Sequence, residues 1–176
     1  MILLFLMVIF FVMYFNRVPY LDNIAINNQQ LIKPCAGELV AIEDNSNYLH
    51  LYWFLGVTDI HSQIMPVNGT IINVKNDGDE LYPANQFDRA KENKRIVTTI
   101  LTKHHAKIII EQVSGILTAK ITNHLKRKQS VNAGDKIGRI YLGSQVVLRL
   151  PKSHYSRDKI IEKIGQENKI GSLLYA

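Results

Sequence analysis

Hydrophobic residues follow two different patterns along this chain of 176 residues. The first fifteen residues, MILLFLMVIFFVMYF, are apolar without a break, as is typical of a membrane-associated helix. Beyond residue 21 the apolar residues form short runs, rich in Val, Ile and aromatic residues and bounded by Gly, Asn, Asp and Pro, which are typical of β-strands. The pattern predicts a mainly β protein with two packed antiparallel sheets, a half-barrel sandwich, and an N-terminal membrane-associated helix.

The runs that predict strands are spread over most of the remaining chain. They occupy residues 37–44, 48–56, 69–79, 94–102, 106–115, 136–150 and 169–176. Between them, no segment repeats its apolar residues at helical spacing for more than one or two turns. We therefore expect the core to lie between sheets.

The N-terminal segment is predicted to be a retained membrane anchor. As a helix, fifteen residues reach roughly 22 Å, which is less than the ~30 Å hydrocarbon core of a bilayer. The segment lacks the charged start and the small-residue cleavage site of a secretory signal. We expect an anchor over residues 1–21 and a β domain over residues 22–176, with a cleaved signal or a buried core helix as the alternatives.

Composition narrows the chemistry and the partners. Cys35 is the only cysteine and no histidine pair has a metal-binding spacing, so neither an intramolecular disulfide nor a metal site is expected. The net charge of +6 favours an acidic partner. The basic run Lys126–Lys128 suits acidic lipid headgroups or is a solvated loop, and no aromatic residues alternate with it. A phospholipid membrane is therefore the predicted partner, and nucleic acid is not.

One small pair, Gly143-Ser144, interrupts the apolar run over residues 138–151. A glycine inside a strand usually marks a bulge or a close approach of two backbones. A glycine followed by a hydroxyl can also be a reactive peptide bond. The pair is a candidate for either feature.

Histidines are the main candidates for acid–base chemistry. His61 lies two residues after Asp59, and residues two apart on an extended chain share a face, so Asp59 is placed to orient or stabilise the imidazole. The adjacent His104 and His105 fit a turn between two strands. For phosphate, Lys33, Lys75, Arg95 and Arg149 all remain candidates, because spacing singles out none of them.

Seven segments of the chain resemble, in order, the motifs of the phosphatidylserine decarboxylase family. His61 and Asp59 match the family's Asp-Val-His block, and Gly143-Ser144 matches its Leu-Gly-Ser motif. The segments are MYFNRVP, IKPCAGELVAIE, FLGVTDIHSQIMPVNG, AKENKRIVTTI, IIIEQVSGILTAKI, VNAGDKIGRIYLGSQVVLRLP and KIGQENKIGSLLYA. The resemblance implies a membrane-associated, pyruvoyl-dependent lyase that converts phosphatidylserine, or a related serine phospholipid, to phosphatidylethanolamine.

The resemblance also implies roles for particular residues. The chain would cleave itself between Gly143 and Ser144, and Ser144 would become a covalent pyruvoyl group, the pyruvate cofactor, which acts as an electron sink. His61 would serve the decarboxylation step, with Asp59 beside it. A serine phospholipid and the membrane are then the expected partners, and a second copy of the chain, forming a homodimer, is a further candidate partner.

Three departures from the family motifs bear on self-cleavage. Ala36 stands where many members have an aspartate that pairs with a second histidine. Ile64 stands at the position of that second histidine. Gly56-Val57 replaces the usual Ser-Pro. Either the base for Ser144 has moved, with His61, His104 and His105 as candidates, or the chain is an uncleaved, inactive relative that binds lipid or protein at a membrane. A purely structural membrane protein is a third reading.

Overall fold

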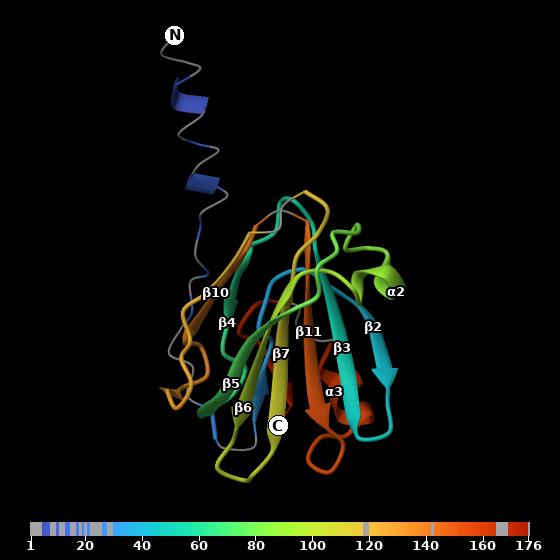
Figure 1. The fold of residues 1–176 in the computed structure, drawn as a ribbon. Coiled ribbons are helices and arrows are strands. Elements are labelled where there is room, and N and C mark those ends of the chain that lie inside the picture. Colours follow the sequence, from blue (N-terminus) through green and yellow to red (C-terminus); the bar gives the residue numbers. More distant parts are fainter. Residues whose placement is uncertain are drawn as a thin grey trace.

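The computed structural model describes residues 30–117, 120–141, 143–164 and 169–175, together with scattered positions before residue 30. The described part is mainly β, as the sequence pattern predicts, with few helices (Figure 1). Its strands belong to three sheets rather than the expected two, and every pairing of neighbouring strands within these sheets is antiparallel.

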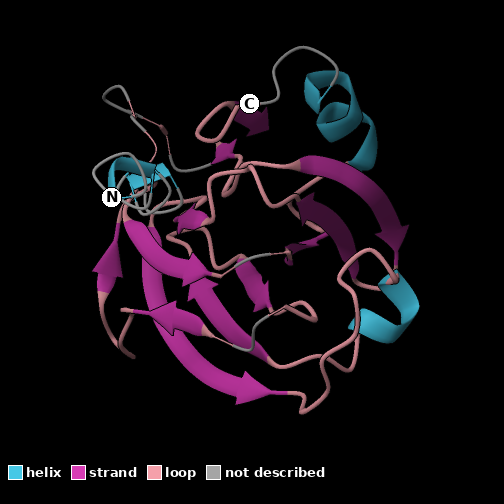
Figure 2. Ribbon diagram, turned by 90° about the horizontal axis from the view of Figure 1, so that it is seen from above, coloured by secondary structure: helices cyan, strands magenta, loops and turns pink. Residues whose placement is uncertain are grey.

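The largest sheet has seven strands in the order β2-β3-β11-β7-β6-β5-β9. Viewed from above, its strands curve around the interior of the molecule (Figure 2). In chain order the strands are β2 (Glu38–Asp44), β3 (Tyr48–Leu55), β5 (Gly69–Asp77), β6 (Arg95–Leu101), β7 (Lys107–Val113), β9 (Ser130–Val131) and β11 (Ser144–Pro151).

Two small sheets complete the fold, one with the order β4-β10-β8 and one with β1-β12. Backbone hydrogen bonds run between their strand ends, from Ile32 N to Pro66 O (3.0 Å) and from Ile64 N to Pro34 O (2.9 Å). Because Pro34 and Pro66 have no N–H, the ladder stops there and the two sheets stay separate. The strands are β1 (Leu31–Ile32), β4 (Ser62–Ile64), β8 (Ile121–Asn123), β10 (Lys136–Ile140) and β12 (Leu173–Tyr175).

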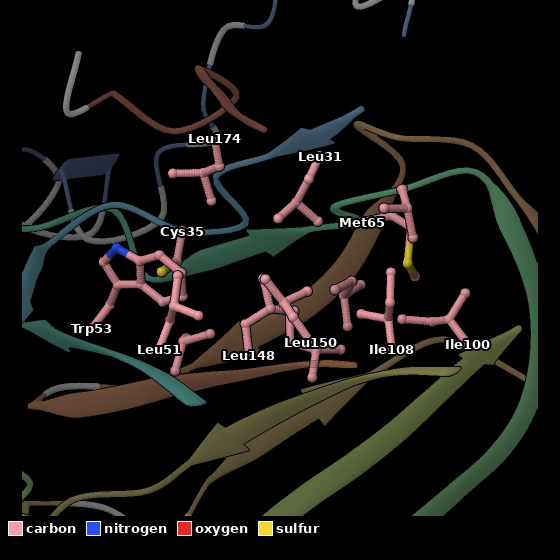
Figure 3. Packing of buried hydrophobic residues seen from close by; sticks show 14 of the residues in the cluster. Leu31, Cys35, Leu51, Trp53, Met65, Ile100, Ile108, Leu148, Leu150 and Leu174 are labelled. Atoms are coloured by element: carbon pink, nitrogen blue, oxygen red, sulfur yellow. The ribbon is translucent and has the colours of Figure 1, made fainter. Parts of the chain in front are cut away.

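The hydrophobic core fills the space between the large sheet and the small ones (Figure 3). In β11, Val146, Leu148 and Leu150 belong to this core. Side chains alternate between the two faces of a strand, so Ser144 lies in phase with these core residues. The β11 residues Gln145 and Arg149 belong to the opposite face of the large sheet.

Two short helices lie outside the sheets among the described residues after residue 30. They are α2 (Phe87–Ala90), between β5 and β6, and α3 (Arg157–Ile164), which follows β11. The expected N-terminal membrane helix is not confirmed, because the residues that the structure describes contain no helix long and apolar enough to cross a membrane. Several residues of the segment 1–21 lie outside the described residues.

Candidate active site

The Gly143-Ser144 bond lies at the start of β11, where the strand enters the core. Gly143 has a φ of 61°, in the left-handed region that glycine adopts without steric cost. Ser144 is fully buried and pairs with Leu55 at the end of β3. Its hydroxyl has no hydrogen-bond partner within the described part of the chain. A buried hydroxyl without a partner is costly in a folded protein, which points to a chemical role.

Gly115 leaves room for the carbonyl group of the same bond. A Cβ atom added to Gly115 would overlap the carbonyl oxygen of Gly143, far inside any normal contact distance. The obstacle is backbone, so it cannot be relieved by the movement of a flexible side chain. Gly115 is therefore required for the present position of the Gly143 carbonyl.

We expect Gly115→Ala to block cleavage of the chain at Gly143. The added methyl group must displace either the Gly143 carbonyl or residue 115 itself, and catalysis is sensitive to displacements of about 1 Å. Mass spectrometry of the purified variant should show an intact chain. Gly56→Ala is a matched control, because the nearest atom to its added Cβ is an Asp59 carboxylate oxygen at 3.5 Å; equal cleavage in both variants would contradict the prediction.

His61 lies at the same end of the molecule as Ser144. It ends the connection from β3 to β4, and its carbonyl oxygen accepts a hydrogen bond from Ile140 N at the end of β10 (3.1 Å). Ser144 pairs with Leu55, which begins that same connection. The β3–β4 and β10–β11 connections are thus joined at both of their ends, so the backbone of His61 and the Gly143-Ser144 bond lie in one region.

The hydrogen bonding of the His61 ring assigns its protons. Nδ1 lies 2.8 Å from the backbone carbonyl oxygen of Asp59, which only accepts, so Nδ1 carries the hydrogen. Nε2 is buried and has no partner among the described residues. Burial lowers the pKa of His61 below its ordinary value of 6.5. The hydrogen bond to the Asp59 carbonyl and the negative charge of Asp59 oppose this shift only in part, and the charges of Arg139 and Arg17 add to it. The neutral ring therefore presents a free lone pair at Nε2.

Asp59 orients His61 through its backbone rather than its carboxylate. The carboxylate accepts a hydrogen bond from Gly56 N (2.8 Å) and so closes the turn that carries both residues. The sequence suggested a contact between the Asp59 side chain and the imidazole. In the structure the carboxylate instead stabilises the loop through its hydrogen bond with Gly56 N.

A chain of three side-chain amides, two of them fully buried, fixes the backbone of His61, and the sequence pattern does not reveal it. Gln63 Nε2 donates to the His61 carbonyl (2.6 Å), and Gln112 Nε2 donates to Gln63 Oε1 (2.8 Å). Asn123 Nδ2 in turn donates to Gln112 Oε1 (3.0 Å). Since these residues lie on β4, β7 and β8, the network ties the large sheet to a small sheet beneath His61.

We expect Gln112→Leu to destabilise the protein by about 1–3 kcal/mol, because it leaves the buried Oε1 of Gln63 without its donor and removes one of the two hydrogen bonds that Asn123 Nδ2 donates, the other being to Thr98. The change should also slow any reaction that needs His61. Thermal or urea unfolding would measure the first effect. Thr99→Val, on a half-buried position of β6, is the control; a loss of stability in the control of the same size would argue against a special role for the amide network.

A cavity of about 750 Å³ opens beside Asp59. It offers two cations, Arg17 and Lys169, and two carboxylates, Glu38 and Asp59. The other lining residues are Pro19, Ala36, Gly37, Ile60 and Ile170. The sequence did not single out Arg17 or Lys169, which lie at opposite ends of the chain.

None of the four cations considered for phosphate from the sequence lines this cavity. Lys33 is buried and donates to the carbonyl of Gly37 (2.7 Å), and Lys75 pairs with Asp77 at the surface. Arg95 and Arg149 both pair with the buried Glu111, and all three line a cleft of about 280 Å³ elsewhere in the structure.

The structure separates His104 and His105 from Ser144. Both lie in the hairpin between β6 and β7. Gln145 of β11 pairs with Val113, at the far end of β7 from this hairpin. At about 3.3 Å per residue, the length of β7 puts roughly 20 Å or more between the hairpin and Ser144. These two histidines are therefore wrong as candidates for the base, and His61 is the remaining one.

The fold and the site define an antiparallel β protein with a buried Gly-Ser bond and a neutral histidine in one region. Comparison with known proteins gives the family. The chain matches the family model described as phosphatidylserine decarboxylase over residues 12–176, and it belongs to that family, whose members are carboxy-lyases. Both the resemblance and the expected enzyme class are thereby confirmed.

Relatives named phosphatidylserine decarboxylase proenzyme align with most of the chain. The protein of Parabacteroides distasonis is 28% identical over 156 residues, covering 84% of this chain and 69% of the relative. That of Ehrlichia ruminantium (strain Gardel) is 31% identical over 149 residues, covering 83% and 62%. That of Prosthecochloris aestuarii is 26% identical over 179 residues, covering 97% and 79%. No solved structure matches the chain.

Proposed function

We propose that this chain is a proenzyme that cleaves itself between Gly143 and Ser144 and then decarboxylates phosphatidylserine, or a close serine phospholipid, to the ethanolamine lipid. One observation carries the proposal. The Ser144 hydroxyl and Nε2 of His61 are both buried and both lack a hydrogen-bond partner in the described structure, at one end of the fold. One group has a proton to give and the other has a lone pair to receive it.

Self-cleavage follows from these two groups. Oγ of Ser144 attacks the carbonyl carbon of Gly143 while Nε2 of His61 takes the hydroxyl proton. The C–N bond then breaks, the nitrogen gains a proton, and an ester joins the two residues. Loss of the Ser144 Cα proton breaks the Cβ–Oγ bond and releases Gly143 as a carboxylate. Water then hydrolyses the resulting dehydroalanine, which releases ammonia and leaves a pyruvoyl group at residue 144.

The surroundings of Ser144 suit such a group. The residue is fully buried at the start of a strand, and its reacting atoms have no competing hydrogen bond among the described residues. When present, a pyruvoyl group binds the substrate amine and withdraws electrons from the bond to the departing carbon dioxide. Decarboxylation consumes one proton, which Nε2 of His61 would take up from water and pass to the substrate carbon.

The cavity beside Asp59 is the proposed headgroup site. Arg17 and Lys169 provide positive charge for the phosphodiester, and Glu38 and Asp59 provide negative charge for the amine. This arrangement suits a headgroup that carries both charges. Residues 1–21 would hold the β domain of residues 22–176 at the membrane that contains the substrate.

The intact mass of the purified protein tests the proposal. We expect two pieces, residues 1–143 and 144–176, with the smaller one blocked to Edman degradation, and release of carbon dioxide from phosphatidylserine vesicles. A single uncleaved chain would overturn the proposal. It would instead favour the inactive, lipid- or protein-binding relative that Ala36 and Ile64 suggest.

The rate of self-cleavage should fall to half its maximum only at a pH below 6.5. The reason is that burial lowers the pKa of His61 below 6.5, so that Nε2 keeps its lone pair. Below the lowered pKa, the rate should fall by about tenfold per pH unit. Refolding the denatured precursor across a pH series would measure this. A decline centred above pH 6.5 would be inconsistent with His61 as the base.

The same shift affects stability with a definite sign. Below pH 6.5 the unfolded chain binds a proton at residue 61 that the folded chain binds only at lower pH. The contribution of His61 to stability is therefore fully present above pH 6.5 and is lost as the pH falls toward the lowered pKa.

A further inference from the structure

Exposed apolar side chains gather at the end of the molecule that holds the Gly143-Ser144 bond. Val57 lies in the β3–β4 connection, and Ile116 and Leu117 lie in the β7–β8 connection. Their exposed fractions are 46%, 57% and 62%. We call these three residues the apolar rim. Among the described residues after residue 30, the other large apolar side chains with comparable exposure are Val40 and Ile161.

The rim lies directly against the proposed cleavage site. Cδ1 of Leu117 is 3.6 Å from the position that a Cβ atom on Gly143 would occupy. Ile116 follows Gly115, which abuts the Gly143 carbonyl. Val57 belongs to the same loop as His61. Leu117 therefore lies next to the proposed cleavage site, and Ile116 and Val57 belong to the two loops beside it.

The apolar N-terminal segment is attached to the same loop. The hydroxyl of Tyr14 donates to the carbonyl oxygen of Thr58 (3.3 Å), and Arg17 donates to the same oxygen. Thr58 is the residue after Val57. Phe10 and Met13, on the described part of this segment, are largely exposed. In Figure 1 the described helical turns of the segment lie on the same side of the sheets as the two rim loops.

Basic and aromatic groups lie just behind the rim. Lys120, which ends the β7–β8 loop, is exposed and has its Nζ 5.0 Å from the centre of the Tyr141 ring. The Arg139 guanidinium lies 5.9 Å from the same ring but is buried and donates to Ser62 Oγ, so of these two cations Lys120 is the one at the surface. Apolar tips backed by tyrosine and cations are the arrangement found at membrane interfaces, where the apolar groups enter the hydrocarbon and the cations meet the headgroups. The net charge of +6 acts in the same sense.

We propose that Val57, Ile116 and Leu117 insert into the surface of a phospholipid bilayer, as a second membrane contact besides the N-terminal segment. Insertion of these loops brings the Gly143-Ser144 bond to the level of the headgroups, so that a lipid reaches the site without leaving the membrane. The purpose of this contact rests on the proposed function, whereas the contact itself does not.

Environment-sensitive labels test the insertion in the full-length chain. The fluorophore NBD is attached to Leu117→Cys or, as a control, to Ile161→Cys on α3. Both variants also carry Ser144→Ala, so that the measurement is made on the uncleaved chain. Cys35 does not interfere, because it is fully buried and burial raises the pKa of its thiol. With vesicles of phosphatidylcholine and phosphatidylserine, the label at 117 should shift to shorter wavelength and be quenched by lipids with nitroxide on their acyl chains.

The control separates insertion from general adsorption. The label at 161 should keep the emission it has in water, because α3 follows the opposite end of β11 from Ser144. An unshifted label at 117 on vesicle-bound protein, or equal shifts at 117 and 161, would overturn the proposal.

A functional arm uses Ile116→Glu and Ile161→Glu with Ser144 intact. Ile116→Glu should abolish decarboxylation of phosphatidylserine in vesicles. It should not change self-cleavage or the turnover of a monomeric short-chain phosphatidylserine. Ile161→Glu should change none of these three activities. Equal vesicle activity in the two variants would overturn the proposal. If neither the variants nor the unaltered protein decarboxylates any lipid, the proposed function fails, while the labelling result still decides whether the rim inserts.

Discussion

Replacing Ser144 by alanine should leave the chain in one piece and without decarboxylase activity. Alanine has no hydroxyl to attack the Gly143 carbonyl and no oxygen to eliminate, so neither the ester nor the pyruvoyl group can form. The fold should survive, because the hydroxyl makes no hydrogen bond among the described residues and its loss leaves no partner unsatisfied. Denaturing electrophoresis and the intact mass measure cleavage, and release of carbon dioxide from phosphatidylserine measures activity.

The chain supplies its own control for this experiment, a second Gly-Ser bond at Gly171-Ser172. Gly171 also has a positive φ, of 84°, and Ser172 is also largely buried. The hydroxyl of Ser172, however, donates to the carbonyl of Lys169 (2.7 Å). Ser172→Ala should therefore still yield pieces that end at 143 and begin at 144. If Ser144→Ala cleaves as well as Ser172→Ala, the assignment of the bond is wrong.

The comparison of these two bonds shows why conformation alone does not mark a reactive site. Both combine a left-handed glycine with a buried serine. They differ in whether the hydroxyl has a partner and in what lies beside the bond, and neither property is local in the sequence. The sequence singled out Gly143-Ser144 by its place within an apolar strand and by its resemblance to family motifs.

Local sequence patterns predict the strands well, but they do not predict how strands that are distant in the sequence pair with one another. The alternation in β11 follows directly from the apolar run over residues 144–151. The division into three sheets depends on two pairings, of Pro34 with Ile64 and of Pro66 with Ile32. No local pattern reveals these pairings. The amide network has the same character, because Gln63 and Gln112 are 49 positions apart and become partners only through the sheet packing.

The candidate site was predicted in part for a similar reason. His61 and Ser144 came from motifs, but the exclusion of His104 and His105 required the register between β7 and β11. Sequence spacing suggested that the Asp59 carboxylate contacts the imidazole. It did not reveal that the backbone amide of Gly56 takes the carboxylate and leaves the carbonyl to orient the ring.

Replacing His61 by glutamine should slow self-cleavage by about 100- to 10,000-fold, the usual contribution of a general base. Glutamine is polar and of similar size, but it has no lone pair basic enough to take the Ser144 proton. His50→Gln is the matched control, because burial also lowers the pKa of His50 below 6.5, yet His50 lines the separate cleft that contains Glu111. Electrophoresis over time after refolding would compare the two variants.

The outcome for His61→Gln also decides whether one histidine serves both reactions. Ala36 and Ile64 remove the pair that many family members use to activate the serine, and the register places His104 and His105 far from it. If His61 is the base for cleavage, the glutamine variant is cleaved too slowly for its effect on decarboxylation to be observed separately. If the variant cleaves at the normal rate but releases no carbon dioxide, then His61 acts only on the substrate. The proton of Ser144 must in that case go to a different group.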